Sequence, residues 1–214
     1  MLPLQLNLID LNTGNIGSVM KMLSRIGARP TICKSPNDID ERAPIVIPGV
    51  GHFTKAAQSL DAGEWRERLD QLHAAYRPIL GICLGAQLFC QSSEEGPGAG
   101  LGWIPTTVRR FPATDSNGAL LRVPHMCWQS FTPPHGCLPF SAPSGRMYYA
   151  QSYYIEPTST PEHSPYQSNY GDIQFAAVVR SRNAIGMQFH PEKSHRHGMA
   201  LLRAWLAWAS ECNL

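Results

Sequence analysis

The first ninety residues alternate between short apolar runs and segments whose apolar residues recur at helical spacing. The apolar runs, which predict buried strands, cover residues 4–9, 30–33, 45–47 and 79–82. Residues 18–26 and 64–76 instead place their apolar side chains three or four positions apart, which predicts helices. Runs that are buried on both faces are typical of parallel sheets covered by helices. This half therefore predicts an α/β fold with an open, mostly parallel, doubly wound sheet, which binds ligands at the carboxyl ends of its strands.

The second half of the chain is less regular. It predicts strands at 106–111, 120–123, 147–155, 173–179 and 184–189, of which the last two form a closing hairpin. Residues 157–170 are rich in Pro, Ser and Thr and predict a loop, and residues 198–209 predict a final helix. We expect one continuous domain over residues 1–214, with an additional β-rich segment in its second half, because the candidate chemistry comes from both halves.

Composition and charge argue against several classes of partner. The 214 residues carry 18 basic and 16 acidic side chains, so there is no electrostatic footprint for nucleic acid or an anionic membrane. No apolar run reaches the roughly 18 residues that a membrane-spanning helix needs. The N-terminal segment lacks the features of a secretory signal, and the six cysteines form no C-x-x-C pair or zinc-binding pattern. We therefore expect a cytoplasmic protein that binds no metal, nucleic acid or membrane.

A candidate nucleophile follows the last of the predicted strands in the first half, in the sequence Gly81-Ile82-Cys83-Leu84-Gly85. A G-x-C-x-G pattern at a strand-to-helix turn is the thiol counterpart of the nucleophile elbow, in which the turn exposes the nucleophile. A helix N-terminus favours the thiolate of Cys83, and the amide of Leu84 would face a developing oxyanion. A buried structural cysteine beside two packing glycines is the alternative, but the strand–turn–helix context favours a nucleophile.

A thiolate nucleophile needs a base, and the base needs a group that orients it. His190, Pro191 and Glu192 offer both at the end of a predicted strand. Pro191 restricts His190 to extended geometry, in which residues two apart project to the same side. Glu192 would therefore bond one imidazole nitrogen and leave the other for Cys83. Because the two segments lie far apart in the sequence, only the fold can join them.

A third candidate segment follows the strand predicted at 45–47. Gly49, Val50 and Gly51 stand at its carboxyl end, where glycines let the backbone approach a ligand closely or adopt a positive φ. The amides of this segment could complete an oxyanion hole with the amide of Leu84. An ordinary turn between a strand and a helix is the alternative interpretation.

Taken together, these segments resemble the signature sequences of the class I (triad) glutamine amidotransferases. Within that class they are similar to the glutaminase subunits of imidazole glycerol phosphate synthases. That similarity is carried by I-P-G-V-G-H-F at 47–53, S-S-E-E-G at 92–96, V-P-H-M at 123–126 with Trp128, and F-H-P-E-K-S at 189–194. Asp10 with Gly14 and Asn15 also fits the first loop of those subunits, and the match covers essentially the whole chain.

The resemblance implies an enzyme with a Cys-His-Glu triad and no cofactor. Cys83 would attack the side-chain amide of L-glutamine, and His190 would act as the base and then protonate the departing ammonia. Glu192 would orient His190, and water would release glutamate from the thioester. The implied glutamine-binding residues are Gln87, through its side chain, and Ser152 and Tyr153, through their backbone.

The same resemblance implies a partner. Ammonia would pass through a protected interior to a separate (β/α)₈ cyclase subunit, which would make imidazole glycerol phosphate for histidine biosynthesis. The two chains would form a heterodimer. The interface residues implied in this chain are Asn15, Trp128 and Lys193.

Two positions depart from the pattern of the resembled family. Cys127 stands where glycine is usual, and Gln151 replaces the usual histidine before Ser152. These departures keep open a diverged paralogue that supplies ammonia to a surface-sugar (lipopolysaccharide) pathway. A cysteine peptidase or γ-glutamyl hydrolase with the same elbow is disfavoured because Gln87 would then be unexplained. A non-catalytic scaffold subunit is disfavoured because the triad is complete.

Overall fold

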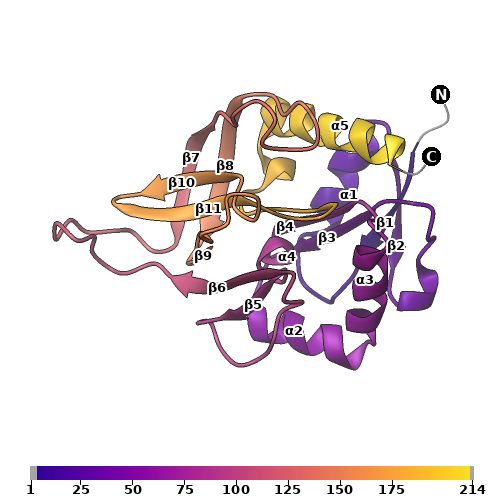
Figure 1. Ribbon diagram of the computed structural model, residues 1–214, viewed down its shortest axis with the longest axis horizontal. Coiled ribbons are helices and arrows are strands. Elements are labelled where there is room, and N and C mark those ends of the chain that lie inside the picture. Colours follow the sequence, from indigo (N-terminus) through magenta and orange to yellow (C-terminus); the bar gives the residue numbers. More distant parts are fainter. Residues whose placement is uncertain (1–3, 213–214) are drawn as a thin grey trace.

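The structure, a computed structural model, describes residues 4–212 and is built around a seven-stranded sheet (Figure 1). Its strands in spatial order are β10 (Tyr166–Tyr170), β11 (Ile173–Ser181), β12 (Ala184–Met187), β4 (Ile79–Cys83), β3 (Ile45–Gly49), β1 (Gln5–Ile9) and β2 (Arg29–Cys33). From β12 to β2 all neighbouring strands are parallel, whereas β11 runs antiparallel to both of its neighbours. The carboxyl ends of β12, β4 and β3 therefore meet side by side.

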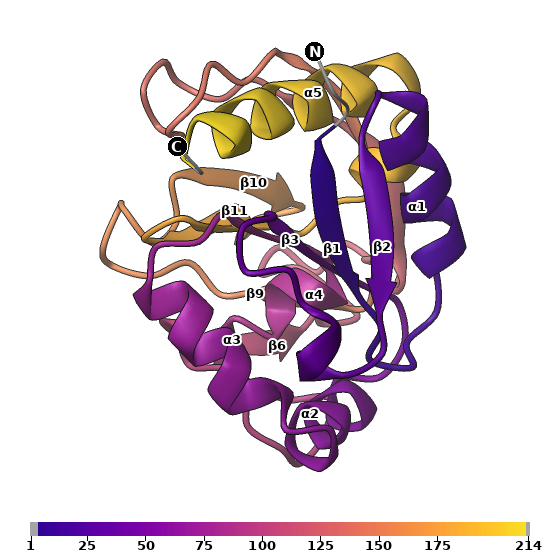
Figure 2. The same ribbon diagram turned by 90° about the vertical axis from the view of Figure 1, so that its right-hand side faces the viewer.

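Helices cover both faces of this sheet, as the alternating pattern predicts. The helices are α1 (Ile16–Arg25) and α5 (His195–Glu211) on one face, and α2 (Phe53–Ala62), α3 (Trp65–Ala74) and the short α4 (Leu84–Gln87) on the other. Figure 2 shows α5 and α2 on opposite sides of the strands. In β3, Val46 packs into the core under α1 and α5, whereas Ile45 and Ile47 pack into the other core. The predicted doubly wound α/β fold is confirmed.

The second half adds two small β structures to the main sheet. A three-stranded sheet contains β5 (Cys90–Ser93), β6 (Ile104–Arg110) and β9 (Tyr153–Ile155), and a two-stranded antiparallel ribbon contains β7 (His125–Phe131) and β8 (Gly145–Gln151). The ribbon is fixed to the core through Met147 and Tyr149, which are fully buried in the cluster that also contains residues of α5. Two short 3₁₀ turns, at Pro36–Asp38 and Pro191–Lys193, complete the described elements.

Several predictions for the second half were wrong. Residues 120–123 form no strand, because Leu120 makes only an isolated bridge to Thr114 and its side chain is 86% exposed. Residues 166–170 form the edge strand β10 within the segment predicted as a loop. Their polar composition fits an edge strand with one neighbour. The predicted strand 147–155 is interrupted at Ser152, and strands β5 and β7 were not expected; in the first half, helix α2 was not expected either.

No helix within residues 4–212 is long and apolar enough to cross a membrane.

Two glycines let helix α4 pack directly on the sheet. A Cβ atom on Gly85 would lie 1.9 Å from the carbonyl oxygen of Ile47 in β3. A Cβ atom on Gly81 would lie 2.7 Å from the carbonyl oxygen of Gly85. Both obstacles are backbone atoms, so a side chain could be accommodated only by moving α4 away from the strands. The glycines therefore fix the position of the turn between β4 and α4.

We expect Gly85→Ala to lower the free energy of unfolding by about 3 kcal/mol, because the added methyl group overpacks a backbone contact. Gly17→Ala is the matched control, since nothing lies within 4 Å of a Cβ at Gly17 in α1. That substitution should leave stability unchanged or raise it by up to about 1 kcal/mol. Urea denaturation of both variants checks the prediction, and equal stabilities would contradict it.

Candidate active site

Three neighbouring strands deliver the candidate residues to one place. Cys83 ends β4, Gly49 ends β3 directly opposite Cys83 in the strand register, and His190 follows β12 on the other side of β4. Because these strands are parallel, their carboxyl ends form one edge, where such sheets bind ligands. The fold therefore brings together the three segments that the sequence singled out.

The backbone at Cys83 has the strained conformation of a nucleophile elbow. The φ and ψ angles of Cys83 are 53° and −105°, and the residue is 7% exposed. A non-glycine residue keeps such a conformation only where its surroundings enforce it. Here the close packing of α4 on β3 and β4, which Gly81 and Gly85 allow, enforces it. Helix α4 has only four residues, Leu84–Gln87. One helical turn carries little aligned dipole, so the positive charge near the sulfur comes from His190.

His190 and Glu192 form the predicted pair. The imidazole Nδ1 lies 2.8 Å from Glu192 Oε1, and both side chains are almost completely buried. The local geometry differs from the expectation of an extended chain, because Pro191–Lys193 forms a 3₁₀ turn that brings the carboxylate back under the ring. Proline suits the first position of such a turn, where its missing N–H has no partner to lose.

The backbone of His190 is bound on both sides. Its N–H donates to the carbonyl of Tyr148 in β8, at 2.9 Å, and its carbonyl accepts from the hydroxyl of Ser194, at 2.6 Å. The same hydroxyl oxygen accepts from the backbone N–H of Tyr148. Sequence reasoning assigned no role to Ser194 or Tyr148. These contacts fix the ring between the sulfur and the carboxylate.

The environment of His190 favours its protonated form. Burial lowers the pKa of His190. The negative charge of Cys83 and its hydrogen bond raise this pKa, as do the hydrogen bond and charge of Glu192, and together these effects exceed that of burial. The net result is a pKa of about 10, well above the ordinary value of 6.5. The protonated ring of His190 therefore lies between the Cys83 sulfur and the Glu192 carboxylate. An imidazolium beside a thiolate is the ground state of an activated cysteine nucleophile.

The segment after β3 approaches the sulfur from the side opposite His190. A Cβ on Gly49 would lie 3.0 Å from the Cβ of Leu84, so the missing side chain allows the two segments to touch. Val50 and Gly51 line the same pocket as Cys83, and Gly51 has a φ of 132°. The carbonyl of Val50 accepts a hydrogen bond from the N–H of Gly14, at 3.2 Å. Val50 and Gly51 therefore share the pocket of Cys83, and the role of their amides as oxyanion donors stays a prediction.

A pocket of about 200 Å³ opens beside Cys83. Its lining includes the predicted glutamine-binding residues Gln87, Ser152 and Tyr153. The Gln87 amide donates to the carbonyl of Tyr153, at 3.2 Å, and to Gln188 Oε1, at 3.3 Å. Gln87 is thereby held in place by its own hydrogen bonds, with its side chain almost completely buried.

Glu95 also lines this pocket and was missed as a site residue. One oxygen of its carboxylate, Oε2, accepts from the backbone N–H of Phe53 at 2.6 Å, which leaves Oε1 for a ligand. The only sequence signal was its place in the S-S-E-E-G segment, from which no role was inferred. A fixed carboxylate in a pocket of this size suits the ammonium group of an amino acid.

The three predicted interface residues lie in different environments. Lys193 is exposed in the 3₁₀ turn after His190. The half-buried indole of Trp128 stacks on the imidazole of His195, with ring centroids 5.4 Å apart. The side chain of Asn15 is turned towards the triad, because its amide donates to Glu192 Oε1. Their role in binding a partner remains a prediction.

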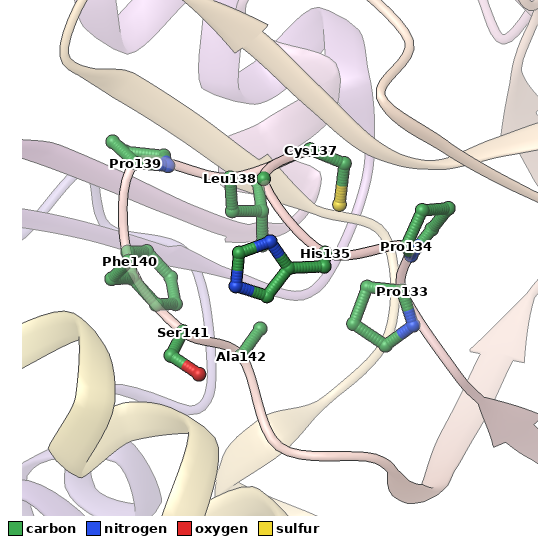
Figure 3. Close-up of a pocket in the computed structure, with 10 residues that line it drawn as sticks. Pro133, Pro134, His135, Cys137, Leu138, Pro139, Phe140, Ser141 and Ala142 are labelled. Carbon is green, nitrogen blue, oxygen red and sulfur yellow. The ribbon is translucent and has the colours of Figure 1, made fainter.

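A second pocket lies in the loop between β7 and β8 (Figure 3). It has a volume of about 280 Å³, and residues 133–142 line it, including His135 and Cys137. None of these residues lines the pocket of Cys83, and none is an Asp, Glu, Lys or Arg. Among residues 4–212, no three His, Cys, Asp or Glu side chains are arranged to hold a metal ion.

Comparison with known proteins identifies the family of the chain. A family model described as "Glutamine amidotransferase class-I" matches residues 7–207. The chain is 38% identical to a Pseudomonas aeruginosa protein named imidazole glycerol phosphate synthase subunit HisH 2, over 91% of this chain and 95% of that one. It is also 38% identical to a protein of the same name from Parasynechococcus marenigrum, over 96% and 95% of the two chains.

Solved structures share the fold at low sequence identity. A crystal structure titled glutamine amidotransferase superposes with a TM-score of 0.70 at 15% identity, covering 95% of this chain and 98% of that one. A chain in the structure of PurLQS from Thermotoga maritima superposes with a TM-score of 0.66 at 15% identity, covering 100% and 99%.

The electrostatics of the site predict how His190 titrates. In the native protein its imidazole should stay protonated through neutral pH and lose its proton near pH 10. Cys83→Ala removes the two contributions from the sulfur and leaves burial opposed only by Glu192, so the pKa should fall. Nuclear magnetic resonance of histidine-labelled protein measures both values, with His190→Asn identifying the signal. An unchanged pKa in Cys83→Ala would show that the sulfur does not act on the ring.

Proposed function

The chain belongs to the class I glutamine amidotransferases, and from this premise we propose that it is the glutaminase subunit of an imidazole glycerol phosphate synthase. It would hydrolyse L-glutamine to glutamate and ammonia and pass the ammonia to a (β/α)₈ cyclase subunit in histidine biosynthesis. The names of its relatives from P. aeruginosa and P. marenigrum support the choice of acceptor pathway. The arrangement of Cys83, His190 and Glu192 beside a small pocket carries the proposal of glutamine hydrolysis.

Substrate binding uses the two ends of the pocket. We propose that the ammonium group of glutamine binds the free carboxylate oxygen of Glu95. The backbone of Ser152 and Tyr153 would contact the same amino-acid end, and Gln87 would help to hold the substrate. Because these groups and Cys83 line the same pocket, a glutamine held by its amino-acid end would direct its side-chain amide towards the sulfur.

The reaction then follows from the charges at the triad. The thiolate of Cys83 would add to the amide carbon, and the oxygen that becomes negative would be stabilised by the amides of Leu84 and of the Gly49–Gly51 segment. The imidazolium of His190 would give its proton to the departing nitrogen, which leaves as ammonia. Neutral His190 would then activate water, which releases glutamate from the thioester and restores the thiolate.

Glu192 would act through His190 alone. Its bond to Nδ1 fixes the ring so that Nε2 faces the sulfur and the substrate nitrogen. Its negative charge also stabilises the imidazolium, in the manner of the carboxylate in other nucleophile–histidine–acid triads. Removing this carboxylate would impair orientation while leaving the base in place.

We further propose that residues 1–214 form one domain that works in the cytoplasm as a heterodimer with the cyclase. Trp128 and Lys193 are the candidates for contacts with the cyclase, whereas the amide of Asn15 is turned towards Glu192. The alternative of a surface-sugar pathway has no support in the names of the relatives. A non-catalytic scaffold would not need an imidazolium enclosed between a thiol and a carboxylate.

A glutamine analogue that carries a diazo-ketone should label Cys83 and abolish glutamine hydrolysis, because the thiolate would attack its electrophilic carbon. Excess glutamine should protect the enzyme by occupying the same pocket. Peptide mapping checks the position of the label. Cys90 is the internal control, since it is fully buried and burial raises the pKa of its thiol. A label on Cys90 or Cys127 would contradict the assignment.

Cys83→Ala should separate the production of ammonia from its use. Combined with the cyclase, this variant should make no imidazole product from glutamine but should make it from free ammonium at high concentration and alkaline pH. Cys212→Ala, which changes an exposed cysteine, should keep both activities. If Cys83→Ala fails with both nitrogen sources while the cyclase alone uses ammonium, Cys83 has a structural role instead.

A further inference from the structure

The carboxylate of Glu192 is held through one oxygen only. Oε1 accepts from His190 Nδ1, at 2.8 Å, and also from the side-chain amide of Asn15. The other oxygen, Oε2, is buried and has no hydrogen-bond partner within residues 4–212. The side chain of Glu192 is fully buried, so its carboxylate depends on the few donors that reach it. Asn15 is therefore one of two groups that fix the orientation of Glu192.

The backbone of Asn15 directs its amide inward. Its φ and ψ angles are 81° and −3°, a left-handed conformation that asparagine tolerates better than most residues. Asn15 immediately precedes helix α1, where an asparagine would ordinarily cap the helix with its side chain. No such capping bond forms here. The amide is instead available to Glu192, which lies 177 residues further along the chain.

The loop that carries Asn15 is attached to the candidate oxyanion segment. The N–H of Gly14 donates to the carbonyl of Val50, at 3.2 Å, and the hydroxyl of Thr13 donates to the carbonyl of Pro48, at 3.4 Å. A Cβ on Gly14 would lie 2.9 Å from a methyl carbon of Val50. These contacts fix the loop against β3, so the amide of Asn15 is presented from a rigid position.

We propose that Asn15 is a positioning residue of the triad, which holds the Glu192 carboxylate against His190 Nδ1. The amide is a neutral donor, so it satisfies the carboxylate oxygen without neutralising the negative charge that stabilises the imidazolium. Without it, the carboxylate would turn, and its bond to His190 would lengthen. This inference rests on the proposed glutaminase function and gives Asn15 a role inside the site, whereas the sequence predicted a role in binding the partner.

The first test compares two substitutions in the same loop. Asn15→Gly removes the amide and keeps the left-handed backbone, because glycine adopts positive φ without strain. Asn12→Gly is the matched control. Asn12 is also left-handed, with a φ of 55°, is exposed, and its side chain makes no hydrogen bond within residues 4–212.

Both variants are assayed with saturating cyclase subunit. Asn15→Gly should lower kcat for glutamine by about tenfold to a hundredfold, the range typical when a group that orients a functional side chain is removed. The KM for glutamine should change by less than about twofold, since Asn15 does not line the substrate pocket. Asn12→Gly should match the native protein in both constants.

The pKa of His190 is the readout that a purely structural role would not move. Glu192 raises this pKa through its hydrogen bond and its charge. A carboxylate that turns away contributes less, so the pKa of His190 should be lower in Asn15→Gly than in Asn12→Gly. The measurement uses the same histidine-labelled protein and resonance as the Cys83→Ala experiment.

Asn15→Asp provides a nearly isosteric second variant, should Asn15→Gly fold poorly. An ionised carboxylate at this position has no N–H or O–H group to donate to Glu192 and repels its negative charge, so kcat should fall at neutral pH. Two carboxyl groups this close share a proton as the pH decreases, and the protonated group can donate to Glu192 again. The ratio of its kcat to that of the native protein should therefore rise towards acid pH.

Three results would overturn the proposal. In the first, Asn15→Gly has the same kcat and the same His190 pKa as Asn12→Gly. Another is a loss of activity that disappears when the cyclase concentration is raised, because Asn15 would then act in binding the partner. A third is an increase in KM alone. If the native protein itself neither hydrolyses glutamine nor reacts at Cys83, the proposed glutaminase function fails. That result is distinct from failure of the Asn15 proposal, in which the native protein is active and the Asn15 variants behave as their controls.

Discussion

The arrangement of the site depends on how closely helix α4 approaches strands β3 and β4. The contact is backbone on backbone, since any side chain at Gly85 would overlap the carbonyl of Ile47. This approach forces the chain to turn at Cys83 with a φ of 53°, which lifts the sulfur out of the sheet at the end of β4. The neighbouring parallel strands then place Gly49 on one side of Cys83 and His190 on the other. A shift of α4 would therefore displace the nucleophile from both of its functional neighbours.

The charges at this edge depend on one another. His190 is buried, and burial alone would keep its ring neutral, but the groups on either side raise its pKa to about 10. Removing one member of a buried ionic group leaves the others without compensation, which is more costly than never burying them. The hydrogen bond that the His190 N–H donates to Tyr148, the one that its carbonyl accepts from Ser194, and the one that Asn15 donates to Glu192 hold these groups in position. Such a group contributes little to stability and much to orientation.

Sequence patterns predicted the parts of the fold and site that are local. Three such parts carry their own signal in the sequence: the apolar run 79–82, the G-x-C-x-G turn and the H-P-E segment. The contact between His190 and Glu192 is also local, because a single 3₁₀ turn forms it. Helix α2 was missed because its buried face contains two alanines, Ala56 and Ala57, which give weak periodicity. The contacts of Asn15 and Glu95 could not be predicted, because their hydrogen-bond partners lie 177 and 42 residues away in the sequence and are brought close only by the packing of loops.

The two departures from the family pattern meet at one histidine. Cys127 Sγ lies 2.7 Å from Nε2 of His125, and Gln151 is the cross-strand neighbour of His125 in the β7–β8 ribbon. Burial lowers the pKa of His125 to about 4, so the ring is neutral and its Nε2 can accept a hydrogen bond from the Cys127 thiol. Side chains alternate along β8, so those of Gln151 and Tyr149 project to the side opposite Ala150. The hydrogen bonds that hold His190 and Glu192 involve neither replacement, but Gln151 also lines the pocket of Cys83.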